Sequence, residues 1–437
     1  MNPEIEKKYT GLIAHLRNRL ESNEFLNRHR KRRQDFTRKR CLPFTFVVLL
    51  LINMMKRSLQ DELDEFFKAL NQEKIASRQV SKSAFSQARK KLEASAFIEL
   101  NEEQVNYFYE HFAPKSWYGF QLRAIDGTLL DVPDNDATRK EFGVWGSRHD
   151  GKGTPKARVS QLFDVLNEVT INAQMAPKSW GERRLAARHL PSLTAEDLLL
   201  LDRGYPAFWF FAAIRQQKAH FCARIDGAEW KIVKEFSHSG LPEQEIVLTP
   251  STSALNDCKL YSVPADSLTL RLVRVDLPSG EVEVLITSLL DSVAFPVALF
   301  KELYHLRWPV EEDYKRLQSR FEIENWSGLT VDAVYQDFHA MIFTKNLAAI
   351  LAQPAQEVIS QSHASRKHDY KTNMTNLISK FKDSVLFLFR DQTISPLLHA
   401  LWQQIVRTIE PIRPNRTYPR TKKLKRRRFP INYKSTR

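Results

Sequence analysis

The segment LLLLDRGY, Leu198–Tyr205, decides the fold class. Its four consecutive leucines are an unbroken apolar run, which is typical of a strand that is buried on both faces of a sheet. The run stops at Asp202, so a carboxylate is expected at the carboxyl end of a buried strand, where open α/β sheets place their ligands. Together with the strands and helix predicted before it, this segment indicates an α/β fold.

Further strands are predicted before this run. Residues 120–133, FQLRAIDGTLLDVP, are expected to form a strand followed by a turn at Asp126-Gly127-Thr128. Residues 157–176 are expected to form a hairpin that turns near Asn167 and Glu168, and residues 181–197 are expected to form a helix.

Residues 221–290 have a strand-rich pattern that lies between two α/β segments, which suggests an insertion. Its predicted strands, with a turn at Pro278-Ser279-Gly280, are HFCARI, KIVKEF, QEIVLT, KLYSVPA, LTLRLVRVDL and VEVLITSL. Residues 1–115 and 295–408 have the helical period, and LHALWQQIV is the last amphipathic segment. Little structure is expected after Pro411.

These patterns divide the chain into six parts. They are a helical N-terminal DNA-binding region (1–118), a first core part (119–220), a β-strand insertion (221–290), a second core part (291–350), a C-terminal helical region (351–410) and a basic tail (411–437).

The net charge of +15 is concentrated in two segments. Residues 28–40 hold eight bases and one acid, and residues 416–437 hold ten bases and no acid. Such segments suit a polyanion such as nucleic acid, although a solvated arm and tail without a partner would have the same composition. The three cysteines are far apart and in no metal-ligand spacing, which favours a reducing compartment. The N-terminus is polar and the apolar run in Leu42–Met55 is short and interrupted, so neither a secretory signal nor a membrane span is expected.

Residues 78–97, RQVSKSAFSQARKKLEASAF, predict a basic helix. Ser81 or Ser83 can cap it, and Phe85, Ala88 and Leu92 are expected to face inward. The side chains expected to face outward are those of Lys82, Gln87, Arg89, Lys90 and Lys91. The segment could be a recognition helix for DNA or an ordinary basic surface helix.

The segment YHLRWPVEEDYKRLQ, residues 304–318, concentrates polar groups in one direction. On a helix, one polar stripe would consist of Tyr304, Arg307, Glu311, Lys315 and Gln318, beside an apolar stripe of Val310, Tyr314, Leu317 and Phe321. Pro309 suits the first turn of a helix, which would put Glu311 near its start. A solvated helix with pairs such as Glu311–Lys315 is the alternative.

Three carboxylates, Asp126, Asp202 and Glu311, could therefore converge from two strands and a helix. Unpaired carboxylates in one place repel each other, and their pKa values rise. A divalent cation removes this conflict, and oxygen ligands favour Mg²⁺ or Mn²⁺. For each aspartate alone, a role in a strand-end turn is the alternative.

The segments IDGTLL, LLLLDRGY and YHLRWPVEEDYKRLQ, in this order, resemble the insertion-sequence DDE transposases named for the signature Y-x2-R-x3-E-x6-K, the group around insertion sequence four. Tyr304, Arg307 and Glu311 match this spacing, while Gln318 stands where the pattern has Lys. Lys315 lies one turn earlier on the same stripe. The stretch VSKSAFSQARKKL and the basic tail are also similar to members of this group.

The resemblance implies an RNase H-like core with Asp126, Asp202 and Glu311 as the catalytic, metal-binding triad, and two Mg²⁺ or Mn²⁺ ions. It also implies transposition of a mobile element by end binding, strand cleavage and strand transfer on double-stranded DNA. A homodimer in the synaptic complex and a cytoplasmic, nucleoid-associated bacterial location would follow. The expected DNA contacts are Tyr304, Arg307, Lys315, Gln318, Arg89, Lys90, Lys91, Lys422, Lys423, Lys425, Arg426, Arg427 and Arg428. Two alternatives are a transposase-derived DNA-binding protein without catalysis and a metal-dependent nuclease of the same fold.

Overall fold

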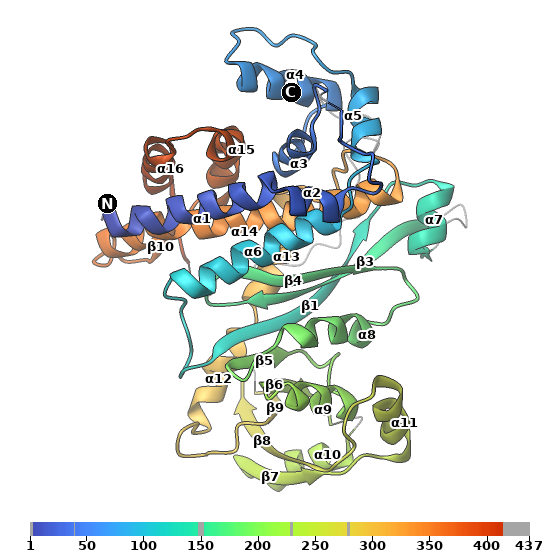
Figure 1. Cartoon of the computed structure of the whole chain (residues 1–437). Helices are drawn as coiled ribbons and strands as arrows, with labels where there is room; N and C mark the ends of the chain where they lie inside the picture. The colour runs from blue at the N-terminus through green and yellow to red at the C-terminus, as the bar shows by residue number, and fades with distance from the viewer. Residues whose placement is uncertain (1–2, 39, 147–152, 228–229, 278–279, 414–437) are drawn as a thin grey trace. The chain divides into compact units, whose positions relative to one another are not determined.

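The computed structural model describes residues 3–38, 40–146, 153–227, 230–277 and 280–413 (Figure 1). The chain divides into two compact units. Unit 1 consists of Met1–Ala113, Val132–Glu141 and Arg316–Arg437, and unit 2 consists of Pro114–Asp131 and Phe142–Lys315. The six domain boundaries expected from the sequence remain predictions.

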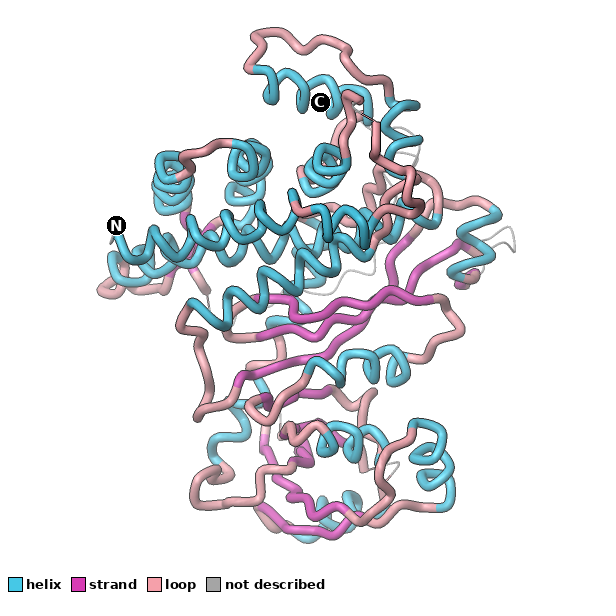
Figure 2. The backbone as a smooth tube through the Cα atoms, viewed as in Figure 1, coloured by secondary structure: helices cyan, strands magenta, loops and turns pink. Residues whose placement is uncertain are grey.

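Unit 2 is built on one mixed sheet, in which nine strands of the described residues take part (Figure 2). These strands are β1 (Gln121–Asp131), β2 (Val144–Trp145), β3 (Thr154–Asp164), β4 (Val169–Ala176), β5 (Asp197–Leu201), β6 (His220–Ile225), β7 (Glu243–Leu248), β8 (Leu268–Asp276) and β9 (Val282–Thr287). Their order is β2-β3-β1-β5-β6-β9-β8-β7, with β4 paired to β3. The chain is therefore a mixed α/β protein, as predicted.

The centre of the sheet is parallel. β5 pairs in parallel with β1 on one side and with β6 on the other. All four leucines of β5 are fully buried, which confirms the predicted two-sided burial of this strand. The predicted hairpin is also confirmed, because β3 and β4 pair antiparallel around a turn at residues 165–168.

One face of the sheet packs against helices of unit 2. Leu199 and Leu201 contribute to this apolar core together with Phe210, Phe211 and Phe221. The helices of unit 2 are α8 (Glu182–Ala186), the 3₁₀ helix η1 (Ala187–Ser192), α9 (Phe208–Gln216), α10 (Lys231–Ser239), α11 (Thr252–Tyr261) and α12 (Ala298–His305). The predicted helix at 181–197 is shorter than expected, because it changes to 3₁₀ geometry at Ala187 and then meets Pro191.

The turn predicted at Asp126-Gly127-Thr128 is wrong, because β1 runs straight through these residues. They lie within a continuous antiparallel pairing with β3, in which Asp126 is opposite Gln161. Gly127 has another function here: a Cβ at this position would lie 3.1 Å from the Val159 carbonyl oxygen. The glycine permits close approach of two strands, and Asp126 lies inside a long strand instead of at its end.

Two of the strands predicted in the insertion are also wrong. KIVKEF lies in α10, where Val233 and Phe236 are buried one turn apart and Gly240 ends the helix in the left-handed conformation. KLYSVPA begins in the last turn of α11, which Ser251 caps, and continues into a loop. The other four predicted strands are confirmed as β6, β7, β8 and β9, and they extend the central sheet. Within the predicted turn, Pro278 and Ser279 lie outside the described residues.

Unit 1 is helical, as predicted for both ends of the chain, with one small two-stranded sheet. Its helices are α1 (Pro3–Glu21), α2 (Asn23–His29), α3 (Phe44–Ile52), α4 (Leu59–Asn71), α5 (Lys82–Arg89), α6 (Ser95–His111), α7 (Asp136–Phe142), α14 (Val331–Ser362), α15 (Met374–Arg390) and α16 (Ser395–Arg407), and its strands are β10 (Tyr370–Thr372) and β11 (Ile409–Pro411). The long helix α14 packs against α3, α6 and α16, so that N-terminal and C-terminal helices share one core.

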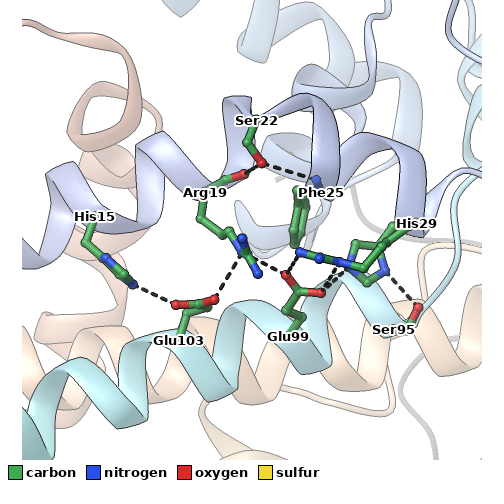
Figure 3. Close-up of polar contacts among 9 residues, drawn as sticks. His15, Arg19, Ser22, Phe25, His29, Ser95, Glu99 and Glu103 are labelled. Atoms are coloured by element: carbon green, nitrogen blue, oxygen red, sulfur yellow. Dashed lines mark hydrogen bonds and ion pairs between the residues drawn. The ribbon is translucent and has the colours of Figure 1, made fainter.

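A polar network fastens α1 and α2 to α6 (Figure 3). Glu99 of α6 pairs with Arg19 at 2.8 Å, with Arg28 at 2.7 Å and with His29 at 2.8 Å. Glu103, one turn later, pairs with Arg19 at 3.0 Å. Arg28, the first base of the N-terminal basic segment, is therefore engaged inside unit 1.

Along the described parts of the chain, every helix is too short or too polar to cross a membrane.

Candidate functional site

Asp126 lies in the middle of β1 and is half-buried. One of its carboxylate oxygens, Oδ1, accepts a hydrogen bond from the N–H of Gly127 at 2.9 Å. Burial raises the pKa of Asp126 from its ordinary value of 3.8 to about 6, and the negative charges of Glu311 and Asp202 act in the same direction. The Gly127 hydrogen bond and the cation of Arg307 act in the opposite direction. The three predicted carboxylates thus lie near enough to one another to interact electrostatically.

Asp202 directly follows β5, as the sequence predicts. Its Oδ1 accepts a hydrogen bond from the N–H of Arg203 at 2.7 Å and a longer one from the hydroxyl of Tyr304 at 3.4 Å. The same hydroxyl lies 3.4 Å from the carbonyl oxygen of Leu201. Tyr304 is only 8% exposed, so its hydroxyl supports the end of β5 from the inside.

Glu311 lies in the first turn of α13 (Pro309–Ser319), the helix that Pro309 begins, as predicted. Its Oε1 lies 2.6 Å from Nη2 of Arg307, which is itself 5% exposed. The predicted single helical stripe is interrupted, because α12 ends at His305 and a turn at residues 306–308 separates it from α13. Arg307 therefore belongs to this turn and reaches forward to the helix start.

Tyr314 connects two of the three carboxylates through the backbone. It lies one turn after Glu311 on α13 and donates a hydrogen bond from its buried hydroxyl to the carbonyl oxygen of Asp126 at 2.8 Å. This bond fixes the helix that carries Glu311 to the strand that carries Asp126. The apolar stripe correctly predicts that Tyr314 is buried, but it does not predict the hydrogen bond to β1. The only sequence signal for this bond is a tyrosine three residues after the candidate glutamate.

Oxygen is the only donor type in this group, which is what Mg²⁺ and Mn²⁺ prefer. Asp126, Asp202 and Glu311 would be the residues that hold such an ion. Burial is the main cause of the raised pKa of Asp126, and the charges of Glu311 and Asp202 add to it. Among the described residues, no group of three or more His, Cys, Asp or Glu side chains is gathered as closely as a formed metal site requires.

The expected DNA contacts between Tyr304 and Gln318 differ in their exposure to solvent. Tyr304 and Arg307 are buried against the carboxylates, whereas the side chain of Lys315 is 62% exposed and pairs with Glu312 at 2.5 Å. Gln318 is half-buried on the same helix, one turn after Lys315. A solvated helix would pair Glu311 with Lys315. In the structure, Lys315 pairs with Glu312 and Glu311 pairs with Arg307 instead.

The predicted outward direction of Arg89 is wrong. α5 is capped by Ser81 as expected, but Arg89 is only 5% exposed. Its guanidinium pairs with Asp337 at 2.9 Å and hydrogen-bonds Gln336 at 2.9 Å and Ser327 at 2.7 Å. These partners come from distant sequence, so the helical period could not reveal that Arg89 is a structural residue inside unit 1.

The other bases of this segment are accessible. Lys90 is exposed, and Lys91 lines a groove of about 790 Å³ in unit 1, between α5 and residues 34–38 and 40–42. Arg38 and Arg40 line the same groove. The predicted tail contacts lie outside the described residues; these are Lys422, Lys423, Lys425, Arg426, Arg427 and Arg428.

The fold and the site together define a mixed-sheet α/β protein whose candidate centre consists of three carboxylates on β1, after β5 and at the start of α13. The sequence profile of the transposase DDE domain matches residues 117–347, more than half of the chain, and includes all three carboxylates. The chain belongs to the transposase DDE domain family.

Known transposases are similar to this chain. The transposase InsG for insertion sequence element IS4 of Escherichia coli K12 is 24% identical over 294 residues, which cover 65% of this chain and 64% of that protein. The match thus spans a little less than two thirds of that relative's length. The piggyBac transposase in a synaptic complex with hairpin DNA, a solved structure, has 11% identity and a TM-score of 0.44, over 92% of this chain and 84% of that one.

Proposed function

We propose that this protein is a DNA transposase that binds the ends of an insertion sequence and catalyses strand cleavage and strand transfer. One observation carries the proposal: within unit 2, the charges of Glu311 and Asp202 act on Asp126 and, after burial, raise its pKa. All three residues lie inside the region that the transposase DDE domain matches. Membership of that family and the similarity to InsG support the same activity.

The order of strands supports an RNase H-like core. In β4-β3-β1-β5-β6, an antiparallel hairpin lies beside three strands that run in parallel. Asp126 is on the central strand of this set and Asp202 follows the neighbouring strand. The proposed insertion, residues 221–290, lies between Asp202 and Glu311 and would account for the long gap between them. β7, β8 and β9 lie within it, and most of β6 does as well.

The chain's own side chains would prepare the site for phosphoryl transfer. Tyr304 orients Asp202, Tyr314 fixes the strand of Asp126, and Arg307 holds Glu311. Two Mg²⁺ or Mn²⁺ ions, held by the three carboxylates, would activate the attacking hydroxyl and stabilise charge on the leaving oxygen.

DNA would be held by bases outside this centre. Lys315 is exposed on α13 and can contact a phosphate. Gln318, one turn later on the same helix, can donate a hydrogen bond but carries no charge. In unit 1, the groove with Arg38, Arg40 and Lys91 carries basic side chains that can contact DNA phosphates. The basic tail and a homodimer in the synaptic complex complete the proposal.

Cleavage of the element's own ends would test this function. A plasmid that carries the reading frame with its flanking DNA is incubated with the protein and Mg²⁺. Wild type should release the element, whereas Glu311→Gln should bind the same DNA and leave it intact. Glu312→Gln is the matched control, because Glu312 is exposed on the same helix turn and faces Lys315 instead of the aspartates.

The two alternatives give different results in the same assay. A protein without catalysis would bind the ends and never cut them in any metal. A nuclease of the same fold would cut, but a pre-cut end would not be joined to target DNA. Equal cleavage by wild type and Glu311→Gln would remove Glu311 from the proposed centre.

A further inference from the structure

Residues 180–188, which run from just before α8 into η1, carry an aromatic and cationic surface outside the three-carboxylate centre. The guanidinium carbon of Arg184 lies 4.2 Å from the ring centroid of Trp180, and that of Arg188 lies 5.4 Å from it. Both arginines are exposed and the indole is half-buried. We refer to Trp180, Arg184 and Arg188 as the Trp180 surface.

The charge of this surface is not neutralised within the described part of the chain, where neither Arg184 nor Arg188 forms an ion pair. A neighbouring cluster differs in this respect. Lys178 and Arg158 each lie 5.1 Å from the ring of Trp145, but Arg158 also pairs with Glu182 at 2.6 Å. Lys178 donates a hydrogen bond to the carbonyl oxygen of Val144 at 2.9 Å. The Trp180 surface thus differs in having two arginines beside one ring without an acidic partner among the described residues.

α8 is attached to the loop that carries Asp202. Nε of Arg183 donates a hydrogen bond at 2.8 Å to the carbonyl oxygen of Gly204, two residues after Asp202. α8 also packs beside β3 and β1, the strand of Asp126 (Figure 1). The Trp180 surface therefore belongs to the same unit as the carboxylates, and α8, which carries Arg184, is bonded to the loop that follows Asp202.

We propose that the Trp180 surface binds single-stranded DNA beside Asp202. An indole and two guanidinium planes offer flat faces on which an unpaired base can stack, and the two cations can hold its phosphates. Duplex DNA conceals its base faces, so it would use only the charges of such a surface. This inference rests on the proposed function, because it names the form of DNA strand that lies next to the carboxylates.

Binding is tested with the full chain in EDTA, so that no cleavage is needed. The probes are a fluorescein-labelled single strand of about 12 nucleotides, within the size range of single-strand sites, and a duplex of the same sequence. Trp180→Ala should weaken single-strand binding about tenfold, as expected for loss of one base–aromatic stack, and change duplex binding less than about twofold. Trp180→Phe, which keeps an aromatic ring, should retain part of the preference.

The charges are tested separately. Arg184→Gln with Arg188→Gln should lower the slope of log K against log salt on the single strand by about 1.4, or about 0.7 for each phosphate contact. Lys231→Gln, which removes a charge that is 91% exposed on α10, is the control and should leave single-strand preference unchanged.

The outcomes separate this inference from the proposed function. If Trp180→Ala lowers single-strand and duplex binding equally, or changes neither, the Trp180 surface does not bind single strands, whether or not the protein cleaves DNA. If wild type and Glu311→Gln both show the preference and Trp180→Ala loses it, the inference holds even if cleavage is never observed.

Discussion

Replacement of Asp126 by Asn is expected to stabilise the folded chain by about 3 kcal/mol at pH 8 in the absence of divalent metal. Burial, with the repulsion from Glu311 and Asp202, raises the pKa of Asp126 from 3.8 to about 6. Each tenfold change in a proton-binding constant corresponds to about 1.4 kcal/mol, so the ionised carboxylate is about 3 kcal/mol less favourable in the folded chain than in the unfolded one. Asparagine removes the charge and can still accept the hydrogen bond of Gly127.

Because the pKa of Asp126 is raised in the folded chain, the stability gained by Asp126→Asn depends on pH. Below about pH 4, Asp126 is protonated in both states, so the substitution should give no gain. Above pH 6 the carboxylate is ionised in both states and the full gain appears, with about 1.5 kcal/mol at pH 5. A protonated carboxyl in this position thus stabilises the fold at low pH, and this contribution is lost as the pH rises through about 6.

Urea unfolding in EDTA at pH 8 and pH 5 measures both values, with circular dichroism as the signal. Asp266→Asn, an exposed aspartate in the loop before β8, is the control and should change the free energy of unfolding by less than about 0.5 kcal/mol. Added Mg²⁺ should then stabilise wild type more than Asp126→Asn. A variant no more stable than wild type at pH 8, or a gain that is equal at pH 5, would refute the reasoning.

Three further predictions concern the supporting residues. Tyr314→Phe removes only the hydroxyl that binds the Asp126 carbonyl, so single-turnover cleavage should slow about five- to tenfold, matching a hydrogen bond of about 1 kcal/mol, while the Kd for DNA stays constant. Arg89→Met should lower the free energy of unfolding by about 3 kcal/mol or more, because Asp337 loses its buried partner; Lys90→Met should change it by less than about 0.5 kcal/mol in the same urea titration. Lys315→Ala should cost about 1.5–3 kcal/mol of transition-state stabilisation, because it removes a charged contact to a phosphate, and Gln318→Lys should leave the cleavage rate unchanged or raise it. Cleavage rates at saturating DNA measure both effects. A near-normal rate for Lys315→Ala together with a large gain for Gln318→Lys would show that Lys315 does not replace the signature lysine.

The parts of the site that could be predicted depend on local sequence. Four leucines before Asp202 are sufficient to predict a buried strand with a carboxylate at its end, and Pro309 before Glu311 is sufficient to predict a helix start. Both features involve neighbours within a few residues. The structure places Asp202 and Glu311 where these patterns put them.

The features that could not be predicted depend on distant partners. Asp126-Gly127-Thr128 has the composition of a turn, yet the pairing of Asp126 with Gln161 keeps the strand straight. Arg89 occupies an outward position by helical period, yet Asp337 of α14 makes its burial favourable. In both cases a tertiary contact overrides a correct local preference, and a single sequence contains no signal for it.

Arg307 is a buried cation that acts on two of the three candidate carboxylates in unit 2. Its guanidinium is buried, pairs with Glu311, and lowers the pKa of Asp126 against the combined effect of burial and two other acids. Burial is the largest effect and acts together with the other two acids, so the pKa of Asp126 stays about two above its ordinary value despite this cation. If all three carboxylates are ionised, they and Arg307 together carry two negative charges, which one divalent cation would neutralise. The free protein can therefore keep its centre folded by retaining a proton on Asp126 at mildly acidic pH, and it reaches the fully ionised state at the lowest cost when positive charge is supplied from outside.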